Sequence, residues 1–310
     1  KTYNPKEFIA ASMTMDISNQ NKLSEFYEEL KRLNVEIVRP NINECYADFR
    51  TIENKFYYAL GGIKAVGYEA ISNIVEERNK NGKFKSINDF LSRVNPKDIN
   101  KLQLEGLVKA GGFDNLNTNR QALFDSIPNF ILKTKNIFDN KLANQIDLFS
   151  EDEENKDDIV NDIEDWKFEE RLSKEFEAIG FFISDHPLNQ FTEIFNDYKI
   201  IDYSKFQSND EIKEANIAAT LLKVQERKTA KGNSYAVLKL TDLSSVFEIF
   251  IFSDILELNR EILKEGDSLI FTLIKNISND ENRFRRINVQ KIASLKDLFN
   301  SPINEVSFDI

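Results

Sequence analysis

The period of the hydrophobic pattern changes near residue 216, and this change constrains the fold more than any other feature of the chain. Up to that point the apolar residues recur at the spacing of helices. Beyond it they alternate with polar residues, which is the period of a β-strand. The alternation predicts five strands, at 217–224, 234–240, 246–252, 268–277 and 284–292. A helix is predicted over 254–263, between the third strand and the fourth.

This order of strands is that of a small closed oligonucleotide-binding (OB) barrel. In the helical part a glycine-bearing turn occurs twice beside a helix, at 61–67 and at 109–113, which predicts two helical hairpins. A helical pair over about 5–34 and a small strand pair at 35–40 and 56–60 precede them. The predicted fold class is therefore α+β with several domains: a helical start, a tandem helix-hairpin-helix region and a five-stranded OB barrel.

The composition excludes several kinds of catalytic and metal site. With one cysteine, Cys45, and one histidine, His186, the chain has no internal disulfide and no cysteine- or histidine-rich metal centre. No Asp-x-Asp pair on an apolar strand and no phosphate-binding glycine loop occurs either. We therefore expect no catalytic residue, metal or cofactor here, a core role for Cys45 and a structural hydrogen bond for His186.

The ends and the charge of the chain predict its setting. The sequence has no signal segment and no apolar run of about 18 residues, so we expect a cytoplasmic protein without a membrane partner. Its first residue is Lys1, which suggests a piece of a longer protein. The net charge of −11 argues against a nucleic-acid partner, but much of the acid lies in 151–165, which predicts a solvated linker.

The turn of the first predicted hairpin has the features of a phosphate site. A glycine-bearing turn that leads into a helix can point backbone N–H groups at a phosphate, as helix-hairpin-helix motifs do when they bind DNA without reading its sequence. The usual motif has glycine on both sides of the apolar residue, whereas this chain has alanine on the first side. The alternative is that the glycines only permit a sharp turn. The candidate duplex-DNA contacts are Lys64, Ala65, Val66, Gly67, Lys109 and Gly111.

Alternation on the barrel predicts a second interface. Glu248 must point outward, so Phe250 shares its face, and an outward Lys239 brings Tyr235 and Val237 with it. Exposed rings beside cations are typical of single-strand binding, because bases stack on the rings and phosphates meet the charges. The alternative for the rings is that another domain covers them. Arg283, Arg285 and Arg286 either add a second phosphate contact or belong to a solvated turn. The candidate single-strand contacts are Arg227, Lys228, Lys231, Tyr235, Lys239, Phe250, Arg283 and Arg285.

A short peptide, Gln145-Ile146-Asp147-Leu148-Phe149, stands just before the acidic stretch. Two adjacent large apolar residues in a polar setting have no core to join, so a pocket on a partner protein explains them. Leu148 and Phe149 are the predicted anchors, and Gln145 and Asp147 are the predicted polar contacts. In an arbitrary loop, chance would account for five such residues.

Together these motifs resemble the carboxyl-terminal part of the bacterial DNA polymerase III alpha subunits. The resemblance covers nearly the whole chain, and the order of the motifs is as specific as any one of them. The motifs are 3–8 (YNPKEF), 37–43 (IVRPNIN), 61–67 with 82–84 and 89–90, 109–114 (KAGGFD), 145–149 and 180–188.

The resemblance implies a division of labour. It implies that 1–55 ends the fingers domain, that 56–140 binds duplex DNA and that 141–165 carries a peptide for the sliding clamp, followed by an acidic linker. It also implies a helical connector over 166–212, an OB barrel near single-stranded template over 213–295 and the start of a tail domain over 296–310. The catalytic palm with its magnesium, the site for the clamp-loader tau subunit and any site for the proofreading subunit then belong to parts of the parent enzyme outside this chain.

Other classes of protein share parts of this pattern. An NAD-dependent DNA ligase also combines hairpins with a barrel, but it needs a four-cysteine zinc site, which one cysteine excludes. A non-enzymatic nucleic-acid-binding scaffold, or a tRNA-binding barrel fused to helices, stays open as the alternative. Neither of these explains the peptide at 145–149.

Overall fold

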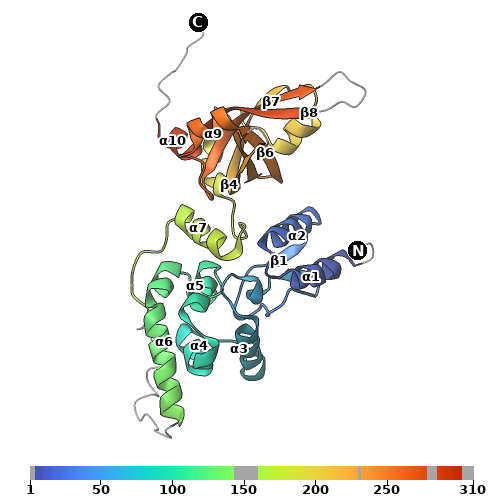
Figure 1. Ribbon diagram of the computed structural model, residues 1–310. Coiled ribbons are helices and arrows are strands. Elements are labelled where there is room, and N and C mark those ends of the chain that lie inside the picture. The colour runs from blue at the N-terminus through green and yellow to red at the C-terminus, as the bar shows by residue number, and fades with distance from the viewer. Residues whose placement is uncertain (1–3, 143–159, 230–231, 278–284, 302–310) are drawn as a thin grey trace. The chain divides into compact units, whose positions relative to one another are not determined.

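The structure is a computed structural model that describes residues 4–142, 160–229, 232–277 and 285–301. It forms two compact units, the first ending at Ser184 and the second beginning at Asp185. Unit 1 is largely helical and unit 2 is built on a β-sheet (Figure 1). The change in hydrophobic period near residue 216 therefore falls inside unit 2, just after the start of its first strand.

Unit 1 contains the predicted helical pair, a small sheet and the two hairpins. The strands pair in the order β1-β3-β2, with β1 parallel to β3 and β2 antiparallel to it. The sequence predicted the first and third of these strands and missed β2. The elements are α1 (Pro5–Met15), α2 (Gln20–Arg32), β1 (Glu36–Val38), β2 (Arg50–Ile52), β3 (Lys55–Tyr57), η1 (Leu60–Gly62), α3 (Tyr68–Asn81), α4 (Ile87–Arg93), η2 (Pro96–Asp98), α5 (Lys101–Lys109), α6 (Arg120–Leu142) and α7 (Phe168–Ile179).

The first hairpin turn, residues 63–67, joins η1 to α3 and packs closely on α5. Ile63 and Val66 are both buried in the core of unit 1. A Cβ atom at Gly106 of α5 would lie only 2.7 Å from the Lys64 carbonyl oxygen, so glycine is required there for the turn to approach the helix. Ala65 has a φ of +64°, the left-handed conformation that usually requires glycine. Position 65 thus has the backbone conformation typical of glycine although the residue there is alanine.

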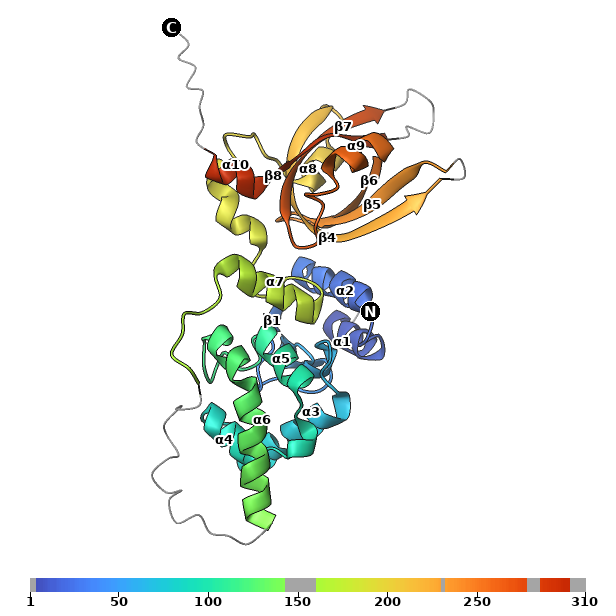
Figure 2. The same cartoon turned by 60° about the vertical axis from the view of Figure 1, so that its left-hand side comes forward.

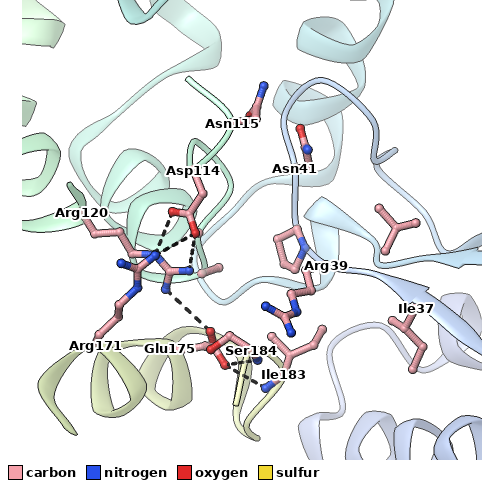
Figure 3. Close-up of a pocket in the computed structure, with 14 residues that line it drawn as sticks. Ile37, Arg39, Asn41, Asp114, Asn115, Arg120, Arg171, Glu175, Ile183 and Ser184 are labelled. Carbon is pink, nitrogen blue, oxygen red and sulfur yellow. Dashed lines mark hydrogen bonds and ion pairs between the residues drawn. The ribbon is translucent and has the colours of Figure 1, made fainter. Parts of the chain in front are cut away.

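A buried arginine joins the second hairpin to α6 and α7 (Figure 3). Arg120 is 3% exposed; its Nε and Nη2 donate to Asp114, and its Nη1 donates to the Lys109 carbonyl and lies 3.6 Å from Glu175. Burial alone would lower the pKa of Arg120, but the hydrogen bonds and charge of Asp114, with the charge of Glu175, outweigh it and leave that pKa raised. The guanidinium therefore stays charged and ties three segments together.

The chain returns to the start of α6 after residue 160. Asp165 accepts a hydrogen bond from the Gln121 backbone N–H and pairs with Arg171, while Trp166 packs on Phe124. α7 then lies against α5 (Figure 1). The predicted connector over 166–212 is thus divided, with α7 in unit 1 and its remaining residues from 185 onward in unit 2.

Cys45 and His186 have the structural roles expected from the sequence. The Cys45 thiol is buried, and burial raises its pKa to about 12, which leaves it an unreactive core group. The Nδ1 atom of His186 accepts a hydrogen bond from the Leu188 backbone N–H, so this ring caps the start of η3.

Unit 2 is a five-stranded antiparallel sheet with the strand order β6-β5-β4-β7-β8 (Figure 2). This pairing, with a helix after the third strand of the sheet, confirms the OB-like fold class. The two edge strands β6 and β8 contact each other, although no hydrogen-bonded ladder joins them within the described residues. The elements are η3 (Pro187–Ile194), α8 (Tyr203–Ser208), β4 (Glu214–Lys228), β5 (Ser234–Thr241), β6 (Val246–Phe252), α9 (Ser253–Asn259), β7 (Ser268–Ile277), β8 (Arg285–Ser294) and α10 (Leu295–Asn300).

A buried lysine fixes α8 to the sheet. Leu269, Phe271 and Leu273 point inward from β7, and Lys275 continues their face at 1% exposure. Its Nζ donates to the carbonyl oxygens of Phe206 and Asn209, both at 2.6 Å. These carbonyls lie at the carboxyl end of α8, where helix acceptors need outside donors. The lysine therefore supplies the partners that the end of this helix lacks.

We predict that Ala65→Gly stabilises unit 1 by about 0.5–1 kcal/mol. Glycine adopts the left-handed conformation without the steric cost that alanine bears, and this gain exceeds the extra backbone entropy that glycine loses on folding. The matched control is Ala70→Gly in α3, which should destabilise the unit by about 1 kcal/mol. Trp166 is the only tryptophan and is buried in unit 1, so its fluorescence during urea unfolding reports this unit. A loss of stability in Ala65→Gly as large as that in Ala70→Gly contradicts the prediction.

Candidate nucleic-acid interface

The first hairpin turn offers backbone donors at its helix end. The N–H groups of Lys64 and Val66 donate within the protein, to the carbonyl oxygens of Ala178 and Ile63. Among the described residues no acceptor is found for the N–H groups of Ala65 and Gly67, and the first turn of α3, which begins after Gly67, has no side-chain cap. A phosphate at the start of α3 would therefore also be within reach of the turn's own Gly67 N–H group.

Three of the four predicted contacts in this turn are exposed and the fourth is buried. Lys64, Ala65 and Gly67 are exposed, whereas Val66 is 8% exposed and belongs to the core. Gly67 has an ordinary φ of −74°, and a Cβ atom there would lie 3.2 Å from Nε2 of Gln103. Close packing on α5, rather than backbone freedom, therefore explains this glycine. Of the four predicted contacts, the structure offers the surface of three.

The second hairpin turn is covered by other parts of unit 1. The Lys109 Nζ pairs with Glu177 at 2.9 Å and lies 5.5 Å from the centre of the Phe124 ring. Gly111 has a φ of +78°, and a Cβ atom there would lie 2.2 Å from the Arg120 guanidinium. Both residues thus hold the hairpin against α6 and α7. Their sequence-predicted role as DNA contacts stays a prediction.

The outer face of β4, β5 and β6 contains the rings and cations predicted from the alternation. Glu248 and Phe250 are exposed while Phe247, Ile249 and Ile251 are buried, so the predicted orientation of β6 is confirmed. Tyr235 and Lys239 are only half-buried rather than exposed, because each is flanked on both sides by paired strands. Across the three strands the face has the rows Arg227–Tyr235–Phe252, Gln225–Val237–Phe250 and Lys223–Lys239–Glu248.

One residue of this face, Phe252, was missed from the sequence, and the sequence did not reveal which residue Arg286 approaches. Phe252 is 47% exposed and stands beside Tyr235 in the register. The Arg286 guanidinium of β8 lies 5.9 Å from the centre of the Phe252 ring. The alternation that placed Phe250 outward also reaches Phe252, so the sequence contained that signal. Arg286 was named from the sequence, with Arg283 and Arg285, as a second phosphate contact or part of a solvated turn; its place beside Phe252 depends on β8 coming next to β6.

The basic end of the face lies at the β4–β5 hairpin. Arg227 and Lys228 are both exposed, and Arg227 donates to Gln225 Oε1 at 2.7 Å. Lys231 and Arg283 lie outside the described residues, and Arg285 is described only as the first residue of β8. One end of the face therefore has cations beside Tyr235 and Phe252, and the other end has Glu248 opposite Lys239.

The peptide Gln145–Phe149, with its predicted contacts Gln145, Asp147, Leu148 and Phe149, lies outside the described residues. The segments on either side belong to unit 1: α6 ends at Leu142, and the return segment is held on α6 by Asp165 and Trp166. Among the described residues no group of three His, Cys, Asp or Glu side chains could hold a metal ion. Within the same residues, no helix is long and apolar enough to cross a membrane.

Comparison with known proteins agrees with this geometry. The family model for the helix-hairpin-helix motif matches residues 34–123, which contain both hairpin turns. The DNA polymerase III subunit alpha of Campylobacter jejuni is 34% identical over 278 residues, which are 86% of this chain and 23% of that protein. The subunit of Rickettsia bellii is 33% identical, and the match covers 84% of this chain and 24% of that protein. The subunit of Borreliella burgdorferi is 28% identical, and the match covers 97% of this chain and 26% of that protein.

The chain spans about a quarter of the length of these relatives. The matches include both units, since they extend over most of the 310 residues. The resemblance stated from the motifs is thereby confirmed: most of this chain is similar to one part of the DNA polymerase III alpha subunits.

Proposed function

We propose that this chain is the DNA- and clamp-binding carboxyl-terminal part of a replicative polymerase subunit and that it carries no catalytic residue itself. The observation that supports this most is that the chain combines a helix-hairpin-helix motif with an OB-like sheet whose outer face exposes rings beside cations. The same chain is similar to DNA polymerase III alpha subunits over most of its length. The parent enzyme would perform template-directed nucleotidyl transfer with magnesium in a palm domain outside this chain.

In this proposal unit 1 holds the duplex. The uncapped start of α3 faces a backbone phosphate, and the exposed Lys64 adds positive charge beside it. Such contacts position a protein on DNA without reading its bases. That property suits an enzyme that must follow any template.

Unit 2 holds a single strand on the outer face of β4, β5 and β6. Phe250 and Phe252 are 49% and 47% exposed, which leaves their rings open to bases. Arg227, Lys228 and Arg286 surround the same end of the face and can meet phosphates. Glu248 at the other end repels phosphate, so we expect the strand to run over the rings at the arginine end.

The segment 145–149 would bind the sliding clamp, with Leu148 and Phe149 as anchors and Gln145 at the rim of the pocket. This part of the proposal rests on the sequence and on the family, since the peptide is outside the described residues. The tau subunit of the clamp loader and the proofreading subunit would bind other parts of the parent protein. A cytoplasmic location follows from the same proposal.

For the single strand, we predict that Phe250→Ala and Phe252→Ala each weaken the binding of an oligo-dT strand by about 1–3 kcal/mol, because each removes a stacking surface for a base. Binding should also weaken with rising salt as phosphate contacts are screened. Fluorescence anisotropy with labelled oligonucleotide measures both effects. The control is Leu258→Ala, an 82% exposed leucine on α9, which should leave affinity unchanged. Equal affinities for all four proteins would show that the strand binds elsewhere.

For the clamp, we predict micromolar binding, roughly −8 kcal/mol, that is lost when Leu148 and Phe149 are both changed to alanine, because the anchors of the peptide are then missing. Calorimetry of the whole chain with purified clamp measures this. Leu132→Ala on α6 is the control, since Leu132 is an exposed leucine, at 59%, outside the peptide. Clamp affinity that survives the double substitution rules out this peptide as the clamp site.

A further inference from the structure

A pocket of about 380 Å³ with a mixed polar and apolar lining lies within unit 1, away from the uncapped start of α3 (Figure 3). Its walls come from the loop after β1, the second hairpin turn, the first residue of α6, the inner side of α7 and the chain at Ile183 and Ser184. This volume is within the range of sites for small organic ligands. Nothing in the proposed grip on DNA or clamp uses it.

The pocket has one positive charge that the surrounding acids do not neutralise. Arg120 is paired with Asp114 and Glu175, and Arg171 is paired with Asp114 and Asp165. Arg39 also lines the pocket, and its side chain is exposed. No ion pair joins Arg39 to an acidic group in the described part of the chain. It is therefore the cation at which an anionic group of a ligand would bind.

The pocket also has a buried acceptor without a hydrogen-bond donor. Glu175 is 0% exposed, and its Oε1 accepts from the backbone N–H groups of Ile183 and Ser184 at 2.8 and 2.9 Å. Its Oε2 receives no hydrogen bond from the described residues, and the nearest cation atom, Arg120 Nη1, is 3.6 Å away. A buried carboxylate oxygen in this state is costly unless a ligand or water donates to it.

We propose that this pocket binds a mononucleotide, with its phosphate on Arg39 and a sugar hydroxyl donating to Glu175 Oε2. The apolar lining from Ile37, Pro40 and Ile183 would contact the base. An inorganic phosphate could satisfy Arg39 but would leave this wall and most of the volume unfilled. The ligand must therefore combine an anion, hydroxyl donors and an apolar or aromatic part.

The test is calorimetric titration of the whole chain with each of the four ribonucleoside monophosphates, with the matching nucleosides and with inorganic phosphate. At least one monophosphate should bind, and its nucleoside and phosphate alone should each bind about tenfold more weakly or worse. No binding of any monophosphate up to about 5 mM, a range that still detects millimolar affinity, overturns the proposal. Inorganic phosphate that binds as tightly as the nucleotides also overturns the proposal, because the pocket would then be a site for anions alone.

Two substitutions assign the contacts. Arg39→Gln should weaken the bound monophosphate about tenfold and leave the nucleoside unchanged, because one charge-assisted hydrogen bond is lost. Arg50→Gln is the matched control, since Arg50 is exposed on β2, pairs with Asp48 and does not line the pocket. Glu175→Gln should weaken nucleotide and nucleoside alike. If that variant does not fold, the exposed Arg39 still decides, and unchanged nucleotide affinity in Arg39→Gln overturns the proposal.

Discussion

The buried guanidinium of Arg120 is the interaction on which unit 1 depends. It reaches from the first residue of α6 to Asp114 after the second hairpin turn, and its charge is balanced by Glu175 on α7. A buried charge is tolerated only when partners surround it, and removal of one partner from such a group commonly costs about 3–5 kcal/mol. The three segments therefore take their positions from one side chain, and the first hairpin rests on α5 within the same frame.

Unit 2 rests on a different principle, because alternation along its strands separates a dry face from a wet one. The inner face is filled by aliphatic and aromatic residues, and among the described residues of this unit Lys275 is the one buried lysine. The outer face has two exposed phenylalanine rings, Phe250 and Phe252, which a hydrophobic core would normally bury. Rings left in water beside cations are a cost to a protein that binds nothing, and they are of use on a surface that receives bases.

The sequence predicted what local rules determine, and it missed what depends on distant segments. Strict alternation placed Phe250 outward and Ile249 inward, and the glycine-bearing turns located both hairpins. It did not reveal that Lys109 meets Glu177, 68 positions along the chain, because no local pattern links the two. The approach of Arg286 to Phe252 was hidden for the same reason. Val66, predicted as a contact, is instead the apolar residue that seats its turn.

The return of the chain to α6 has a mechanical consequence. α6 has 23 residues and ends at Leu142, and the chain after residue 160 is attached at the start of that helix, through Asp165 on Gln121 and Trp166 on Phe124. The end of α6 and this attachment are therefore about 33 Å apart along one helix, at 1.5 Å per residue. A tension applied to the chain between these two points therefore acts on both ends of α6, and unit 1 receives the force at two places rather than at one.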